Sequence, residues 1–325
     1  MPTAVCLGEA LTDFVADAAD VSLIDCPGFR KAPGGAPANV AAGLARLGID
    51  TAFLGKVGND PFGRFLARSY AEAGVDTRFM QFDPEHRTGL AFVSLLASGE
   101  RDFVFFRNPS ADMLYRAEEV PDAALEGCRA YHYGSISLIQ EPSRSATLET
   151  LRRARERGAL ISYDPNLRAP LWPDLKAARR EILAALPPAD VVKVSEEEAE
   201  FLFGPAPVDA HLDRLLEAGP RLAAITRGSA GSVLATRTAR AEVPGFAVTA
   251  VDSTGAGDGF VAGLLAGLLR RGGAAALPEL DAETVREIGR LANAVGALAC
   301  TRKGAIPALP TREAVAAFLA AQPGA

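Results

Sequence analysis

The stretch Val251-Asp252-Ser253-Thr254-Gly255-Ala256-Gly257-Asp258-Gly259-Phe260 runs directly into an apolar segment, ending at Leu269, that is typical of a helix. A Gly-Ala-Gly turn at a helix start leaves backbone N–H groups pointing outward, and the helix dipole adds positive potential there. The stretch therefore predicts an anion cradle made by Gly255, Ala256 and Gly257. Such a cradle suits a phosphate that gains charge in a transition state.

Asp258 stands inside this predicted cradle, where a carboxylate that served only as scaffold would repel a phosphate. Its presence is explained if it is a general base that accepts the proton of an attacking hydroxyl. The helix dipole is expected to favour its ionised form, which would make it a weak base. The alternative is that Asp258 only caps the start of the helix.

Two common nucleotide-binding motifs do not fit the chain. It has no GxxxxGK[ST] sequence, so it is not a P-loop protein. The GAGDGF run lacks the last glycine of GxGxxG and places an aspartate where a pyrophosphate would lie, which argues against a dinucleotide-binding fold.

A second glycine-rich stretch, Gly34-Gly35-Ala36-Pro37-Ala38-Asn39-Val40, also runs into a helix-like segment. The two glycines allow the backbone to approach a ligand closely. Asn39 would present its side-chain amide at the helix start, where it suits a sugar hydroxyl. The alternative is an ordinary turn before a helix.

Composition narrows the class of protein. The chain has 325 residues, of which 49% are hydrophobic and 23% charged, as in globular proteins. A net charge of -6 and a pI of about 5.3 argue against binding to nucleic acid or to an anionic membrane. The longest apolar run has ten residues, whereas a bilayer span needs about 20. The four dispersed cysteines and an N-terminus unlike a signal peptide predict a cytoplasmic protein.

Short apolar runs alternate with helical patterns along most of the chain, which predicts an α/β fold with a mostly parallel sheet. Strands are expected at 4–7, 51–54, 160–163, 191–194 and 222–226, and a long helix at 281–302. Residues 88–112 predict a hairpin with strands at 90–96 and 102–106 and a turn at Ser98-Gly99. This hairpin and the helix-poor segment 10–33 form either a lid over a site or an ordinary surface feature.

The two glycine-rich stretches, GGAPANVAAGLARLG at 34–48 and VDSTGAGDGFVAGLL at 251–265, resemble the two signatures of the ribokinase-like (PfkB) carbohydrate kinases. Segments between them, such as GKVGNDPFG and SYDPNLRAPLWP, look like those of bacterial and plant fructokinases. The resemblance implies one kinase domain over 1–325, with a three-layer α/β/α core and a small β-sheet lid inserted at about 10–33 and 88–112. It also implies phosphorylation of fructose by ATP with Mg²⁺ and a K⁺ site. Independently of the resemblance, an apolar face on the lid strands, with Phe92, Phe103 and Phe105, predicts a homodimer formed through these strands.

The resemblance implies a role for individual residues as well, with Asp258 as the catalytic base and Gly255, Ala256 and Gly257 as the anion hole. The sugar side would be formed by Asp13, Gly34, Gly35, Asn39, Arg107, Asn166 and Arg168. The nucleotide side would be formed by Lys193, Ser195, Thr226, Gly228, Gly231 and Asn293. Glu198 would organise Mg²⁺ through water, and a monovalent cation would be held by Asp252 with backbone carbonyls near Thr254, Ala299, Arg302 and Gly304.

Alternatives remain at this stage. Ser195 stands where many relatives have Asn, and the acidic run Glu196-Glu197-Glu198 could be only a solvated helix start. The same fold also serves 2-keto-3-deoxygluconate kinase, which would need an added cation for its carboxylate. A catalytically silent sugar-sensing protein is a third hypothesis, although such a protein could dispense with Asp258.

Overall fold

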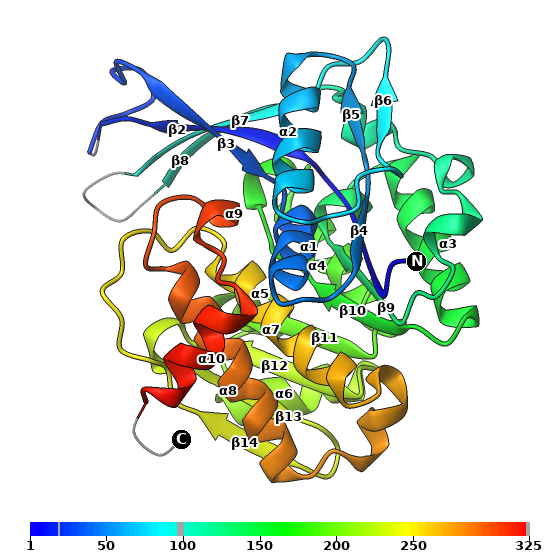
Figure 1. Cartoon of the computed structure of the whole chain (residues 1–325), viewed down its shortest axis with the longest axis vertical. Coiled ribbons are helices and arrows are strands. Elements are labelled where there is room, and N and C mark those ends of the chain that lie inside the picture. Colours follow the sequence, from blue (N-terminus) through cyan, green and yellow to red (C-terminus); the bar gives the residue numbers. More distant parts are fainter. Residues whose placement is uncertain (19, 96–100, 323–325) are drawn as a thin grey trace.

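The computed structural model describes residues 1–18, 20–95 and 101–322. In this part of the chain one large sheet forms the centre and is flanked by helices (Figure 1). Its strands lie in the order β14 (Arg240–Val243), β13 (Ser232–Ala235), β12 (Leu222–Thr226), β11 (Val191–Ser195), β10 (Leu160–Asp164), β9 (Ala130–Gly134), β1 (Ala4–Leu7) and β4 (Thr51–Leu54). β13 is antiparallel to both its neighbours, and the other neighbouring pairs are parallel. The prediction of a mostly parallel sheet is confirmed.

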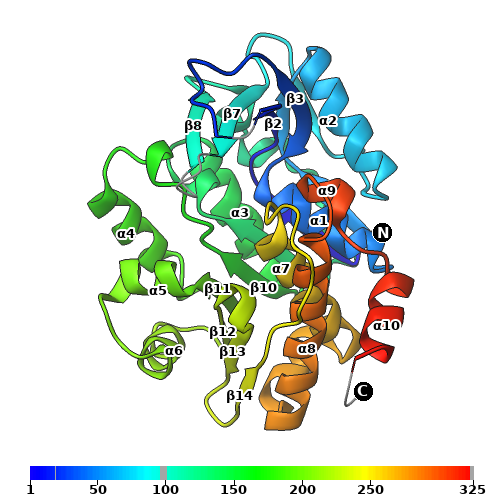
Figure 2. The ribbon, with the colours of Figure 1, turned by 90° about the vertical axis from the view of Figure 1, so that its left-hand side faces the viewer.

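Helices cover both faces of this sheet (Figure 2). On one face lie α1 (Ala36–Arg46), α7 (Ala256–Arg270), α8 (Ala282–Ala299) and α10 (Arg312–Ala320). On the other face lie α3 (Ser143–Glu156), α4 (Leu175–Ala184), α5 (Glu196–Phe203) and α6 (Val208–Glu217). Because side chains alternate along a strand, β1 sends Ala4 and Cys6 into the first apolar cluster and Val5 and Leu7 into the second. The three-layer α/β/α arrangement is confirmed.

A separate sheet, here called the lid sheet, projects from the core (Figure 1). Its strands lie in the order β3 (Phe29–Gly34), β2 (Leu11–Ala16), β7 (Gly89–Leu95) and β8 (Arg101–Phe106). These strands come from the two segments that broke the alternation, so the predicted small sheet is present. Phe14 stacks on Phe92 at 4.9 Å between ring centroids, which binds β2 to β7. The turn expected at Ser98-Gly99 lies outside the described residues.

Shorter elements connect these layers. α2 (Pro61–Glu72) packs against β2 and β3, and β5 (Lys56–Gly58) pairs with β6 (Gln81–Asp83). The remaining helices are α9 (Ala305–Ala308), η1 (Ala111–Leu114), η2 (Ala117–Glu119), η3 (Asp122–Ala124), η4 (Ile136–Leu138), η5 (Ala169–Leu171), η6 (Gly228–Ala230) and η7 (Gly273–Glu279). No single helix in the described ranges is long and apolar enough to cross a membrane. Only α7 and η7 taken together reach that length and composition, and they meet at 83°.

The long helix expected at 281–302 ends earlier than its apolar pattern suggests. It begins as predicted, because the Asp281 side chain caps it by accepting the N–H of Thr284 at 2.8 Å. It stops at Ala299, where the Cys300 and Thr301 N–H groups donate to carbonyls three residues back. The Cys300 carbonyl then accepts the N–H groups of Val251 and Asp252 at 2.8 and 3.2 Å. A tertiary contact that the local pattern does not encode therefore ends the helix.

Candidate active site

The carboxyl ends of β1, β10, β11 and β12 meet at one edge of the large sheet, because these strands are parallel. α1 starts beside the chain that leaves β1, where the Ala36 N–H donates to Glu9 Oε1 at 2.9 Å. α7 starts beside β11, where a Cβ added at Gly257 would lie 3.2 Å from Lys193 Nζ. Two helix N-termini thus face the edge at which open α/β sheets bind ligands.

The loop before α7 has the glycine geometry expected of an anion cradle. Gly255 has a φ of 79°, and a Cβ there would lie 2.8 Å from the Cβ of Ala305, so only glycine fits. The Ala256 N–H donates to the Ser253 carbonyl at 3.2 Å and is therefore occupied by the turn. Gly257 and Asp258, in the first turn of α7, have no carbonyl acceptor within their own helix. Their N–H groups, together with that of Gly255, are the donors that remain for an anion.

Asp258 is buried, with 7% of its surface exposed. Its carboxylate accepts hydrogen bonds from Asn39 Nδ2 at 2.8 Å and from Asn166 Nδ2 at 3.4 Å. Burial raises the pKa of Asp258 to about 6, although the hydrogen bond from Asn39 opposes the rise. Burial thus works against the ionised form that the helix dipole is expected to favour, although a pKa of about 6 still leaves the carboxylate mostly ionised at neutral pH. A carboxylate with this pKa is well suited to accept a hydroxyl proton.

Asn39 connects the glycine-rich segment before α1 to Asp258. The two residues are 219 positions apart in the sequence, and their contact joins the two predicted motifs. While Asn39 Nδ2 donates to Asp258, Asn39 Oδ1 is buried and accepts no hydrogen bond. A buried amide oxygen without a donor fits a site that receives a ligand hydroxyl.

Asp13 on β2 and Gly34 at the end of β3 lie against each other at the base of the lid sheet. A Cβ added at Gly34 would fall 2.3 Å from Asp13 Oδ2, so the carboxylate fits only because residue 34 is glycine. Burial raises the pKa of Asp13 to about 7, Arg168 opposes this and Asp258 adds to it. Gly35 follows with a φ of 103°. The predicted sugar residues Asp13, Gly34, Gly35 and Asn39 therefore lie together beside Asp258.

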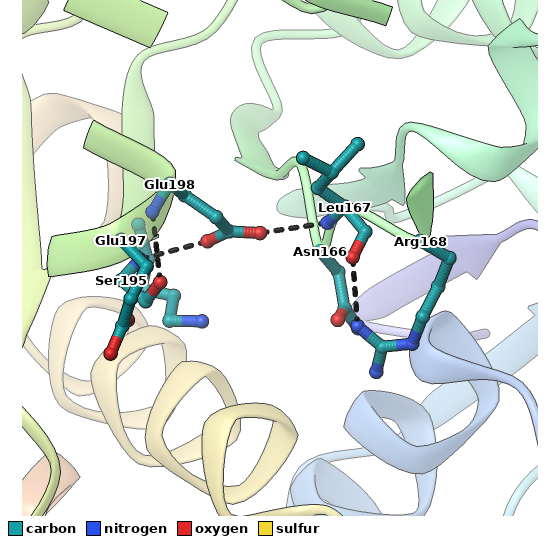
Figure 3. A pocket seen from close by; sticks show the side chains of 7 residues that line it. Asn166, Leu167, Arg168, Ser195, Glu197 and Glu198 are labelled. Carbon is teal, nitrogen blue, oxygen red and sulfur yellow. Dashed lines mark hydrogen bonds between the residues drawn. The ribbon is translucent and has the colours of Figure 1, made fainter. Parts of the chain in front are cut away.

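A pocket of about 340 Å³ opens at Asn166, whose side chain contacts Asp258 (Figure 3). It is lined by Asn166, Leu167, Arg168, Lys193, Ser195, Glu197 and Glu198. Figure 3 shows the loop after β10 on one wall and the start of α5 on the other. Glu198 connects the two walls, because its Oε1 accepts the Leu167 N–H at 2.7 Å and its Oε2 accepts the Ser195 N–H at 2.8 Å.

Ser195 and Glu198 also form a capping box at the start of α5, where Ser195 Oγ accepts the Glu198 N–H at 3.1 Å. The acidic run does start a helix, but only Glu196 and Glu197 are exposed as a solvated helix start requires, whereas Glu198 is half-buried. Desolvation of Glu198 raises its pKa, while the nearby Lys193 opposes the rise. Because Glu198 faces both Lys193 and the pocket, it also remains placed to act on a bound ligand.

The sequence matches the family described as "pfkB family carbohydrate kinase" over residues 1–312. The chain belongs to this family. It is 50% identical over 317 residues to the probable fructokinase-6, chloroplastic, of Arabidopsis thaliana, covering 97% of this chain and 81% of the relative. The fructokinase with bound ATP from Xylella fastidiosa superposes with a TM-score of 0.90 at 39% identity, covering 98% of this chain and 99% of that one.

A double mutant of the fructokinase from Vibrio cholerae O395, solved in a form with bound fructose, ADP and potassium ion, gives a TM-score of 0.86 at 38% identity. The match covers 98% of each chain. These similarities confirm the ribokinase-like fold expected from the two signature motifs. They also establish this PfkB chain as an ATP-dependent carbohydrate kinase.

The predicted nucleotide residues of this kinase follow β11 and β12 toward the sheet edge. Thr226 ends β12, and Gly228 and Gly231 form the next turn with φ values of 56° and 96°. A Cβ at Gly231 would lie 2.2 Å from the Val243 carbonyl oxygen. Asn293 on α8 accepts from Ser232 Oγ at 3.0 Å and donates to the Val243 and Pro244 carbonyls at 3.1 Å. Its amide holds α8 to β13 and β14, so its effect on a nucleotide would be indirect.

The loops proposed for a monovalent cation meet at Asp252. Its Oδ1 accepts the Thr254 N–H at 2.9 Å and the Thr254 hydroxyl at 2.6 Å, and its Oδ2 accepts the Gly304 N–H at 2.8 Å. Asp252, Thr254 and Gly304 are therefore in contact. Ala299 ends α8, and Arg302 lies on the connection from α8 to α9. A carboxylate between two loops rich in carbonyls has the oxygen chemistry that suits a hard cation.

Arg107 lies at the base of the lid sheet, directly after β8, and only 9% of its surface is exposed. Its guanidinium forms a buried ion pair with Asp112, whose other oxygen accepts the Ser110 hydroxyl. Figure 1 places the end of β8 where the lid sheet meets the core. Contact between Arg107 and a sugar stays a prediction.

Two buried carboxylates of the site were missed at the level of the sequence. Glu9, 3% exposed, follows β1 and accepts the first N–H of α1. Asp164, also 3% exposed, ends β10 and lies 3.1 Å from Lys193 Nζ. Each directly follows or ends a buried strand at the ligand-binding edge, and that position is the signal that could have identified them.

Proposed function

We propose that this PfkB kinase transfers the γ-phosphoryl group of ATP to the C6 hydroxyl of D-fructose. The observation that carries the proposal is the position of Asp258, which contacts Asn39 of the sugar segment and begins the helix beside Lys193. The base for the sugar hydroxyl therefore lies next to a positively charged site for the phosphate. The identity of 50% to a relative named as a probable fructokinase supports fructose as the sugar.

In this mechanism the protein binds, orients and neutralises charge. Asn39 and Asp13 hold the sugar hydroxyls, and Asp258 accepts the proton as the new O–P bond forms and the bond from the γ-phosphorus to the ADP oxygen breaks. The N–H groups of Gly257 and Asp258, with the Lys193 ammonium, stabilise the charge on the moving phosphoryl group. The lid sheet covers the sugar and excludes water, which would otherwise hydrolyse ATP.

The donor set fits Mg²⁺ bound mainly through the nucleotide. Among the described residues no group of three or more His, Cys, Asp or Glu side chains could hold a metal ion. Glu198 is the less exposed of the two carboxylates that line the pocket, and it would act on the ion through water. When bound with ATP, Mg²⁺ neutralises phosphate charge.

The proposal is tested by ADP release from MgATP with fructose, 2-keto-3-deoxygluconate, ribose, tagatose or adenosine as the acceptor. We expect the largest kcat/KM with fructose. A larger kcat/KM with 2-keto-3-deoxygluconate would show that this keto acid, and not fructose, is the substrate. Binding of fructose and ATP without release of ADP would show a sugar sensor instead.

The proposal extends to assembly and location. The lid sheet exposes Val104 by 42% and Phe106 by 60%, and burying this apolar surface would favour a homodimer through the lid strands. Light scattering is expected to give twice the chain mass of 34.0 kDa, and Phe106→Asp to give a monomer. A monomeric wild-type protein would refute the dimer. We place the protein in the cytoplasm, which microscopy of a tagged chain tests.

A further inference from the structure

Asp164 is a buried carboxylate for which the proposed mechanism has no use. It is the last residue of β10, at the ligand-binding edge of the sheet, and 3% of its surface is exposed. Its Oδ2 lies 3.1 Å from Lys193 Nζ, and its Oδ1 accepts the backbone N–H of Asn166 at 3.1 Å. The two oxygens of one side chain thus contact two different parts of the site.

The first contact concerns charge on the phosphate side. Lys193 is 7% exposed, and its ammonium faces the first turn of α7, 3.2 Å from the position of a Cβ added at Gly257. A buried ammonium is stable only with a counter-charge. Burial by itself would lower the pKa of Lys193, but Asp164 and then Glu198 raise it above its ordinary value. Asp164 therefore keeps a positive charge beside the donors of α7.

The second contact concerns the base. Asn166 has a φ of 45°, a left-handed conformation that asparagine tolerates better than most residues. The bond from its N–H to the Asp164 side chain two residues earlier stabilises this turn. The turn brings Asn166 Nδ2 to 3.4 Å from Asp258 Oδ1. Asp164 is thus connected to Asp258 through one intervening residue.

We propose that Asp164 is the positioning residue of the phosphoryl-transfer site. One of its oxygens holds Lys193 where the phosphoryl group passes, and the other fixes the turn that presents Asn166 to the base Asp258. This role rests on the proposed kinase function, and it makes one side chain responsible for both the acceptor side and the phosphate side of the reaction.

The charges around Asp258 determine how the role can be measured. Asp258 is faced by Asp13 from β2, Arg168 from the loop after β10, Lys193 from β11 and Asp164 itself. Lys193 is also faced by Glu198 of α5 and by His132 of β9. Among these neighbours, Asp164 acts to raise the pKa of Asp258. Its effect on the pKa of Asp258 is larger than the opposing effect of Lys193, so we expect removal of its charge to move the titration of the base to lower pH.

The experiment compares the pH dependence of kcat for the wild-type protein and Asp164→Asn with MgATP and fructose. Asparagine keeps an acceptor for the Asn166 N–H but removes the counter-charge of Lys193. We expect kcat to fall about ten- to a hundredfold, as small misplacements in a site typically cause. We expect KM for fructose to change little and the acid limb of the kcat profile to move to lower pH.

A matched control is Glu119→Gln, because Glu119 pairs with another buried lysine, Lys56, at 2.6 Å, and neither residue lines the pocket. We expect this variant to have the same kcat as the wild-type protein and an acid limb at the same pH. Asp164→Asn with wild-type kcat would overturn the proposal. So would a reduced kcat with an acid limb that has not moved, because that is the result of a merely structural role.

A second pair of variants keeps the test decisive if Asp164→Asn fails to fold. In Asp164→Ala/Lys193→Met no buried lysine is left without a counter-charge, and alanine, unlike asparagine, also removes the acceptor of the Asn166 N–H. This protein is compared with Lys193→Met alone. A further loss of kcat and a lower acid limb in the double variant support the contact through Asn166, and identical profiles refute it. A wild-type protein that releases no ADP with fructose would refute the proposed function instead, which separates the two failures.

Discussion

At the scale of single residues, the chemistry depends on the environment of Asp258. A carboxylate at the start of a helix is normally stabilised in its ionised form by the helix dipole. Here burial has the larger effect, and the pKa rises to about 6. The sequence was sufficient to propose Asp258 as the base, because its position in the glycine loop is local information. It was insufficient for the pKa, because the burial comes from segments such as Asn39 and Asn166 that are distant in the chain.

The pH dependence of the reaction follows from Asp13 and Asp258. Both pKa values are raised by burial, to about 7 and about 6, and both side chains act as carboxylates, so protonation removes activity. We expect kcat/KM for fructose to fall as the pH drops below about 7 and to fall more steeply below about 6, where the second group also binds a proton. Initial rates with fructose, measured across this pH range, test the predicted fall in kcat/KM. A value that stays constant down to about pH 5 would contradict it.

At the scale of elements, close packing at the ends of β2 and β3 shapes the sugar side. Gly34→Ala would place a Cβ 2.3 Å from Asp13 Oδ2 and displace the carboxylate. Overpacking of this kind typically costs about 1–3 kcal/mol, so we expect kcat/KM for fructose to fall about tenfold or more with KM for ATP little changed. The control is Gly28→Ala, at the other end of the β2–β3 hairpin, where the added Cβ would lie 3.4 Å from Asp17 Oδ2, an ordinary contact distance. Equal losses for both substrates would argue against this placement.

The loops at the start of α7 and the end of α8 lead to a prediction about potassium. Asp252 holds Thr254 and Gly304 together, and a cation beside it would fix the anion-binding turn. We expect kcat to fall when KCl is replaced by choline chloride at equal ionic strength, and this salt dependence to be smaller in Asp252→Asn. Titration of K⁺ into the wild-type protein and into Asp252→Asn measures this dependence of kcat. Identical rates in the two salts would remove the cation from the mechanism.

The elements predicted from apolar runs were correct to within one residue for β1, β4, β10, β11 and β12. β9 was not predicted, because its buried Tyr131, His132 and Tyr133 do not form an aliphatic run. Tyr131 and Tyr133 satisfy their hydroxyls on the Thr147 and Ala185 carbonyls, which makes burial of these polar groups acceptable. Contacts of this kind depend on the folded neighbours and leave no periodic signal.

At the scale of the whole molecule, the fold assembles the site from segments that are far apart in the chain. The lid sheet supplies Asp13 and Gly34, α1 supplies Asn39, β10 and β11 supply Asp164 and Lys193, and α7 supplies Asp258. The two signature motifs predicted the family and most of these residues. They did not predict Asp164, because its role appears only where parallel strands bring their ends together.

The central claim is that Asp258 removes the proton from the sugar hydroxyl. Its most direct test is formation of fructose 6-phosphate by Asp258→Asn, measured beside calorimetric binding of fructose to the same protein. We expect turnover to fall about 10²–10⁴-fold while the fructose Kd stays close to the wild-type value. Turnover close to that of the wild-type protein, with fructose bound normally, would contradict the claim.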